Sequence, residues 1–216
     1  MQAAEVSPLV LRRQVSNSDR EGVRRILDAT GVFHRREIDV AEELVIDALE
    51  KGAASEYLFI FADVDGVTAG YICYGAISMT EAGFDLYWIA TDPCYYNRGI
   101  AAKLLREAEG HIVALGGKYI FVETSSKVQY LPARGFYKKH GYIEVARVPN
   151  YYADGDDKVI LMTTLRGGDT FATNRTFLFS YGQMRWPLVY LTYLPWIVKI
   201  ETVLKFVDWL DRYRKR

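Results

Sequence analysis

Residues 85–105, which read DLYWIATDPCYYNRGIAAKLL, have the composition and order of an anion-binding turn. A predicted strand ends near Thr91, a turn containing Pro93 follows, and Gly99 with two alanines opens a predicted helix. The first turn of a helix leaves backbone N–H groups without partners, and its dipole adds positive charge there. Such a turn can bind a pyrophosphate, because small side chains let the phosphates approach the main chain. A plain strand-to-helix turn has the same pattern, so both interpretations stay open on these residues alone.

The elements that position this turn alternate between strand and helix. Asp65-Gly66 is a strong hairpin signal between two strands, and Gly116-Gly117 is typical of a helix end. The order predicts an α/β fold with a mixed sheet and helices on its faces. Apolar spacing predicts strands at residues 9–15, 57–63, 68–74, 84–91, 119–124, 142–148 and 158–165, a loop at 149–157, and helices at 19–28, 38–50, 99–115 and 133–140.

Two segments resemble the motifs of the GNAT superfamily of acyl-CoA N-acyltransferases. Residues 96–101 (YNRGIA) are similar to the family's acyl-CoA signature Gln/Arg-x-x-Gly-x-Gly/Ala, and WIATDP before them matches its strand-then-proline run. Residues 130–142 (YLPARGFYKKHGY) are similar to the downstream motif Asn-x-x-Ala-x-x-Leu-Tyr-x-x-x-Gly-Phe. The resemblance covers residues 9–165 and fits an uncharacterised subgroup. It departs from the family at Tyr96, which replaces Gln or Arg, and at Tyr130, which replaces Asn.

The resemblance implies acetyl-CoA as co-substrate. In this family the pantetheine arm lies in a splay between the fourth and fifth strands, here residues 84–91 and 119–124. We call the backbone N–H groups of residues 96–102 the cradle. The cradle should still bind the pyrophosphate with Tyr96 present, because it uses main-chain N–H groups and not the side chain. The Tyr130 hydroxyl can partly replace the missing amide. The implied cofactor-binding residues are Ile89, Ala90, Thr91, Tyr96, Asn97, Arg98, Gly99, Ile100, Ala101, Ala102 and Tyr130.

The same resemblance implies direct attack of a neutral amine on the thioester, with three candidate catalytic residues. Tyr137 stands at the family's Tyr position and would protonate the leaving thiolate, since a phenol and an alkyl thiol have comparable pKa values. Asp85 is the candidate base and Glu123 on the facing strand its rival; in a regular strand Asp85, Tyr87 and Ile89 share one face. A packing role for Tyr137 and a solvated or ammonium-holding role for Asp85 are the alternatives.

The predicted function is therefore acetyl transfer to a primary amine of a small molecule. Protein N-acetylation is one alternative, and a catalytically silent acyl-CoA-binding or partner-binding module is another. Residues 30–33 lie where this family often lines its acceptor site, and a helix stop explains them equally well. The acids Asp154, Asp156 and Asp157 lie in a predicted hairpin loop that could reach the acceptor pocket, although turn chemistry also explains them. The three histidines are expected at the surface or at helix ends.

The composition of the chain narrows the remaining classes of function. Lys plus Arg and Asp plus Glu number 27 each, so no overall basicity favours nucleic acid. The first residues lack the pattern of a signal peptide, and the two cysteines fit a reducing compartment, so we expect a cytoplasmic protein. Two cysteines and three histidines are too few to suggest a structural zinc site, and we expect no metal.

A composition change after residues 166–170 predicts a boundary between a domain at 1–168 and an extension at 169–216. Residues 171–216 hold eight Lys or Arg and three acids, so this stretch is +5 while the rest is −5. It contains a predicted amphipathic helix with an apolar stripe from Trp196 to Leu210. The stripe would pack on the domain or on a second subunit, giving a homodimer. A peripheral membrane helix fits the tryptophans and terminal arginines, but the acids on its polar face count against it.

Overall fold

The computed structural model describes residues 8–165, which form one seven-stranded mixed sheet with helices on both faces. The strand order is β1-β2-β3-β4-β5-β7-β6, and only β4 and β5 run parallel. This is the predicted fold class. The strands are β1 (Leu9–Arg12), β2 (Leu58–Val64), β3 (Val67–Ala76), β4 (Gly83–Thr91), β5 (Tyr119–Ser125), β6 (Ile143–Ala153) and β7 (Asp156–Thr164).

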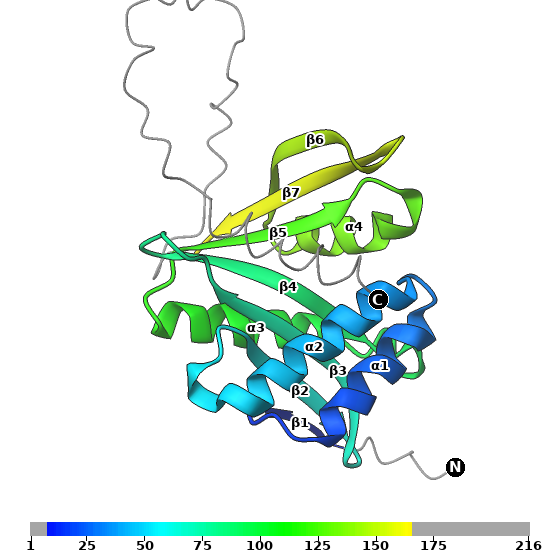
Figure 1. Cartoon of the computed structure of the whole chain (residues 1–216), viewed down its shortest axis with the longest axis vertical. Helices are drawn as coiled ribbons and strands as arrows, with labels where there is room; N and C mark the ends of the chain where they lie inside the picture. The colour runs from blue at the N-terminus through cyan, green and yellow to red at the C-terminus, as the bar shows by residue number, and fades with distance from the viewer. Residues whose placement is uncertain (1–7, 166–216) are drawn as a thin grey trace, which may run out of the picture. The chain divides into compact units, whose positions relative to one another are not determined.

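Two helical layers sandwich the sheet, as Figure 1 shows for α1 and α2 on one face and α3 on the other. Helices α1 and α2 bury Val23, Ile26 and Val45 against Phe61 and Tyr71 of the strands. On the opposite face, α3 and α4 bury a second apolar cluster that includes Tyr137. The helices are α1 (Ser18–Thr30), α2 (Arg35–Lys51), α3 (Ile100–Ala114) and α4 (Leu131–Lys139), with short 3-10 turns at η1 (Gly52–Ala54), η2 (Pro93–Tyr95) and η3 (Val128–Tyr130).

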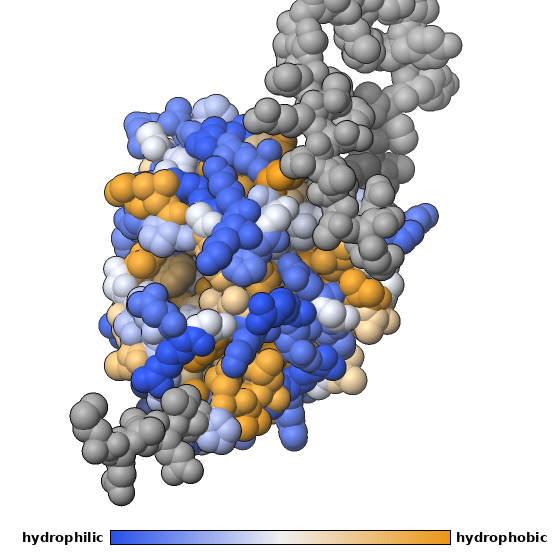
Figure 2. Space-filling view, turned by 180° about the vertical axis from the view of Figure 1, so that it is seen from behind, coloured by the Kyte–Doolittle hydropathy of each residue, from blue (hydrophilic) through white to orange (hydrophobic). Residues whose placement is uncertain are grey.

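Local signals explain most element ends. Asp65 and Gly66 both have positive φ, 53° and 74°, as the predicted two-residue hairpin requires. Gly117 packs so closely that a Cβ would lie 2.3 Å from the side chain of Ile112, so the end of α3 needs this glycine. Seen from the side opposite to Figure 1, polar and apolar side chains are interspersed over the surface (Figure 2).

The predicted loop at 149–157 is wrong, because β6 continues to Ala153 and turns at residues 154–155. The pairing of β6 with β7 shifts register between Val148 and Ala153, so the intervening residues bulge out of the ladder while the strand continues. The first strand is also shorter than predicted and ends at Arg12.

Strands β4 and β5 pair only over their first halves. The last partners are Leu86 and Val122, after which β4 runs on to Thr91 and β5 to Ser125. Figure 1 shows the two strands moving apart beyond this point. The structure therefore contains the splay that the family resemblance implies.

An extra residue in β4 marks the start of this splay. Tyr74 of β3 pairs with Leu86 while Cys73 pairs with Trp88, so Tyr87 has no partner and forms a β-bulge. In a regular strand, successive side chains alternate between the two faces of the sheet. The bulge shifts this alternation by one residue, so Trp88 packs with the α1–α2 cluster and Ile89 with the α3 cluster. The expectation that Asp85, Tyr87 and Ile89 share one face is therefore wrong for Ile89.

The predicted extension at 169–216 and its amphipathic helix lie outside the described residues, so the boundary stays a prediction. Within residues 8–165, every helix is too short or too polar to cross a bilayer.

Candidate functional site

The turn between β4 and α3 carries a run of unpaired backbone N–H groups. Asn97 and Gly99 have φ values of 63° and 73°, and α3 begins directly after them. Within the described residues, no backbone N–H from 97 to 102 donates to a protein acceptor; the first helical bond runs from Lys103 N to Gly99 O at 3.1 Å. Successive N–H groups in such a turn form a concave anion site at the positive end of the helix.

A buried carboxylate fixes the entry to this turn. Asp92 accepts a 2.9 Å hydrogen bond from the Cys94 N–H and forms an ion pair with Arg25 of α1. Arg25 also donates to the Thr68 carbonyl at 2.6 Å, which ties α1, β3 and the turn together. Burial alone would raise the pKa of Asp92, but the bonds from Cys94 and Arg25 outweigh it and lower that pKa.

The predicted phosphate-binding residues take different positions around the turn. Tyr96 is 51% exposed, and the Arg98 guanidinium lies over the Tyr95 ring at 5.1 Å. Ile100 is buried in the core, whereas Ala101 and Ala102 are partly buried. A Cβ on Gly99 would meet no atom within 4 Å, so the space beside it is open, and its positive φ is what favours glycine there.

The second half of β4 presents a free backbone edge to the splay. Ile89, Ala90 and Thr91 pair with β3 on one side and have no β5 partner on the other. Unpaired strand-edge N–H and C=O groups can bond an extended ligand that carries amides. The Ala90 side chain is buried, and the buried Thr91 hydroxyl has no hydrogen-bond partner within residues 8–165.

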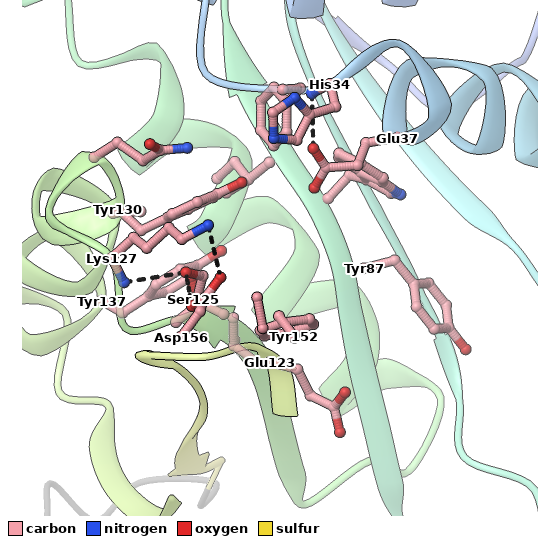
Figure 3. A pocket seen from close by; sticks show the side chains of 18 residues that line it. His34, Glu37, Tyr87, Glu123, Ser125, Lys127, Tyr130, Tyr137, Tyr152 and Asp156 are labelled. Atoms are coloured by element: carbon pink, nitrogen blue, oxygen red, sulfur yellow. Dashed lines mark hydrogen bonds and ion pairs between the residues drawn. The ribbon is translucent and has the colours of Figure 1, made fainter. Parts of the chain in front are cut away.

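A pocket of about 570 Å³ lies where the two strands separate. Its walls come from the α1–α2 connection, β4, β5, η3 with α4, and the β6–β7 hairpin. Figure 3 shows Tyr130, Tyr137 and Lys127 on one side of it, with His34 and Glu37 across from them. Segments far apart in sequence thus meet beside the free edge of β4.

Tyr137 lines this pocket from α4. Its side chain is almost fully buried, with 4% exposure, and its ring packs against Tyr142 at 5.3 Å between centroids. No hydrogen bond to its hydroxyl occurs within the described residues. Burial raises the pKa of Tyr137 above its ordinary value, so the phenol stays protonated at neutral pH.

The two candidate bases occupy different places. Glu123 lines the pocket, has a half-exposed side chain and pairs with Lys158 at 2.6 Å. Asp85 lies in the paired half of β4, opposite Phe121 and Gly75, and does not line the pocket. Only Glu123 therefore shares the pocket with Tyr137.

Of the predicted cofactor contacts, Ile89 and Tyr130 line the pocket itself. The Tyr130 ring meets Phe33 edge-on at 6.4 Å between centroids. Burial, and then the negative charge of Glu37, raises the pKa of Tyr130.

Sequence reasoning found only part of the pocket wall. Phe33 and Asp156 line it as anticipated, whereas Asp154 and Asp157 do not, and His34 is exposed yet belongs to the wall. The capping-box spacing of His34 and Glu37 would have located the start of α2. In residues 8–165, no group of three or more His, Cys, Asp or Glu is placed to hold a metal. The wall residues that were missed include Glu37, Trp88, Lys127, Gln129 and Tyr152.

Comparison with known proteins defines the class of this fold and site. A family profile described as "Acetyltransferase (GNAT) domain" matches residues 55–144. A crystal structure of a protein from Desulfovibrio desulfuricans, assigned to the GNAT family of acetyltransferases, is 41% identical with a TM-score of 0.72. The match covers 74% of this chain and 100% of that one. The chain belongs to the GNAT family of acetyltransferases.

Other relatives are more distant. An uncharacterized N-acetyltransferase from Methanocaldococcus jannaschii is 28% identical over 141 residues, which cover 60% of this chain and 87% of that protein. An aminoglycoside 6′-N-acetyltransferase in complex with coenzyme A shares the fold, with a TM-score of 0.58 at 15% identity. It covers 74% of this chain and 99% of its own.

Proposed function

We propose that this protein transfers an acetyl group from acetyl-CoA to a primary amine of a small molecule. The observation that carries the proposal is a continuous path along β4. The free amides of residues 97–102 lead to the unpaired edge at Ile89–Thr91, and Ile89 opens into the pocket with Tyr137. A diphosphate at the first end and a pantetheine amide at the edge would deliver the thioester to the pocket.

Coenzyme A fits the groups present. The cradle offers main-chain donors rather than a particular side chain, so Tyr96 in place of Gln or Arg leaves it intact. The open space beside Gly99 admits a phosphate. A fold neighbour in complex with coenzyme A supports the same ligand for this chain.

In the proposed reaction the amine nitrogen attacks the thioester carbonyl carbon and forms a C–N bond. The C–S bond breaks, the thiolate takes one proton, and the nitrogen loses one, so an N-acetyl amide and free coenzyme A result. The backbone N–H of Ile89 or Ala90 would donate to the developing oxyanion.

Tyr137 would supply the proton to the thiolate. Its raised pKa makes the phenol a weaker acid than an exposed tyrosine. The thiolate leaves into the same dry surroundings, which raise the pKa of a thiol as well, so the two groups stay matched. Glu123 would take the amine proton, directly or through a water, since it lines the pocket while Asp85 does not.

Calorimetric titration with acetyl-CoA, followed by a thiol-release assay over amines, amino acids and a peptide N-terminus, tests the proposal. We expect acetyl-CoA binding and release that depends on a small amine. Binding without release from any acceptor would instead favour a silent acyl-CoA-binding module, and release only with the peptide would favour protein acetylation.

A further inference from the structure

Glu37 differs from the other carboxylates of the pocket in its partners. Glu123 pairs with Lys158 at 2.6 Å, and Asp156 pairs with Lys127 at 3.4 Å. The Glu37 carboxylate accepts a 2.7 Å hydrogen bond from the backbone N–H of His34, a neutral donor. It forms no ion pair within residues 8–165. The negative charge of Glu37 is therefore not neutralised by a neighbouring side chain.

Three aromatic rings line the pocket together with Glu37. Phe33 meets Trp88 at 5.2 Å and Tyr130 at 6.4 Å between ring centroids, both edge-on, and all three rings line the pocket with Glu37. The effect of the Glu37 charge on the pKa of Tyr130 indicates that the carboxylate lies near this phenol. A carboxylate beside aromatic faces is the chemistry that binds an organic ammonium ion.

The surroundings of Glu37 stabilise positive charge, so they do not suit the amine group that attacks the thioester. A carboxylate without a paired cation, such as Glu37, favours the protonated form of a nearby amine, which has no lone pair with which to attack, whereas the charge of Glu123 is offset by Lys158. The nucleophile must instead meet the thioester near Tyr137. In Figure 3, Glu37 and Glu123 lie toward opposite ends of the pocket.

We propose that Glu37, with Phe33, Trp88 and Tyr130, binds the second, non-reacting ammonium group of a diamine or polyamine acceptor. The inference rests on the proposed function for the reacting end alone. It assigns the acceptor to amines with two cationic groups and disfavours amino acids, since their carboxylate would meet the negative charge of Glu37.

Substitution of Glu37 can separate this role from its structural one. Glutamine also completes a capping box, so Glu37→Gln keeps an oxygen acceptor for the His34 N–H and removes only the charge. Glu43→Gln is the matched control, because Glu43 is an exposed residue of the same helix outside the pocket. Thermal melting of both variants checks that α2 is retained.

The first measurement is binding without turnover. We titrate 1,5-diaminopentane into the protein saturated with coenzyme A and expect Glu37→Gln to weaken binding about tenfold, with Glu43→Gln unchanged. Absence of binding to the unsubstituted protein, or equal affinity in Glu37→Gln, overturns the inference. Binding that depends on Glu37 without any thiol release in the presence of acetyl-CoA upholds the cation site and contradicts the proposed function.

The second measurement compares kcat/KM for pentylamine, 1,5-diaminopentane and lysine, which differ only by the second ammonium group and the carboxylate. The diamine should exceed the monoamine by about tenfold, and Glu37→Gln should abolish this preference while acetyl-CoA affinity stays unchanged. Equal rates for the three amines in the unsubstituted protein contradict the inference and leave the transferase proposal intact.

Discussion

The two parts of the candidate site, the anion-binding turn with the free strand edge and the pocket beside it, are built from different parts of the chain. At the end of β4, the anion cradle and the free strand edge consist of main-chain groups from one continuous segment. The opposite wall consists of side chains from the α1–α2 connection, η3 with α4, and the β6–β7 hairpin. A main-chain site tolerates changes such as Tyr96, because every residue except proline supplies an N–H group. A side-chain site changes its specificity with each substitution.

Loss of the Tyr137 hydroxyl should have the largest effect on turnover. For Tyr137→Phe we expect kcat to fall about 100-fold, because the thiolate then leaves without a positioned acid. The dissociation constant of acetyl-CoA, measured by calorimetry, should change little, because the cradle does not involve this side chain. An unchanged kcat would leave Tyr137 with a packing role only.

The two carboxylates separate in their pH–rate profiles. A base must be ionised to act, so the rate falls as the pH drops below its pKa. Glu123→Gln should remove this acidic limb and lower kcat on the order of tenfold to 100-fold, with water as the remaining acceptor. Asp85→Asn is the comparison and should keep the limb. The reverse pattern would move the base to Asp85.

Acetyl-CoA binding at the turn before α3 should be sensitive to backbone strain rather than to side-chain chemistry. Gly99→Ala places a Cβ at φ 73°, and relief of that strain would displace the free amides. We expect acetyl-CoA to bind about tenfold more weakly, which corresponds to the usual cost of this conformation. Gly116→Ala is the matched control, since its φ is 86° and its Cβ also meets no atom within 4 Å. Equal losses in both variants would indicate global destabilisation.

The smallest effect should come from Asp92, the carboxylate that fixes the start of the anion-binding turn. Asp92→Asn keeps a cap for the Cys94 N–H but removes the ion pair with Arg25, whose side chain is 41% exposed. We expect a loss of about 1 kcal/mol in the free energy of unfolding at pH 7. The pKa of Asp92 is lowered, so its contribution is complete above the unfolded value near 4 and declines as the pH falls through the folded value.

Denaturant unfolding of both proteins between pH 7 and pH 3 checks this sign. The difference between Asp92→Asn and the unsubstituted protein should shrink toward the acidic end. A difference that grows as the pH falls would mean that the ion pair does not stabilise the fold.

Local sequence was sufficient to predict the fold class, the Asp65-Gly66 hairpin and the end of α3, because each depends on neighbouring residues or on short periodicity. It failed at the Tyr87 bulge, where one unpaired residue reverses the strand alternation without a compositional signal. It also failed along β6, whose extension depends on pairing with β7. For the site, local sequence pointed to the anion-binding turn, and the family resemblance pointed to Tyr130, Tyr137 and Glu123. It missed Glu37, Trp88 and Tyr152, because those side chains meet only after distant segments converge.

The opening between β4 and β5 begins at the Tyr87 bulge. The last β4–β5 pair directly precedes it, and a bulged strand bends and twists away from its neighbour. Deleting this residue should restore the alternation of side chains along β4, so that Trp88 would face α3 and β4 could continue its pairing with β5 beyond Leu86. The opening between β4 and β5 thus begins at a single extra residue, so the number of residues in β4 marks where the two strands separate.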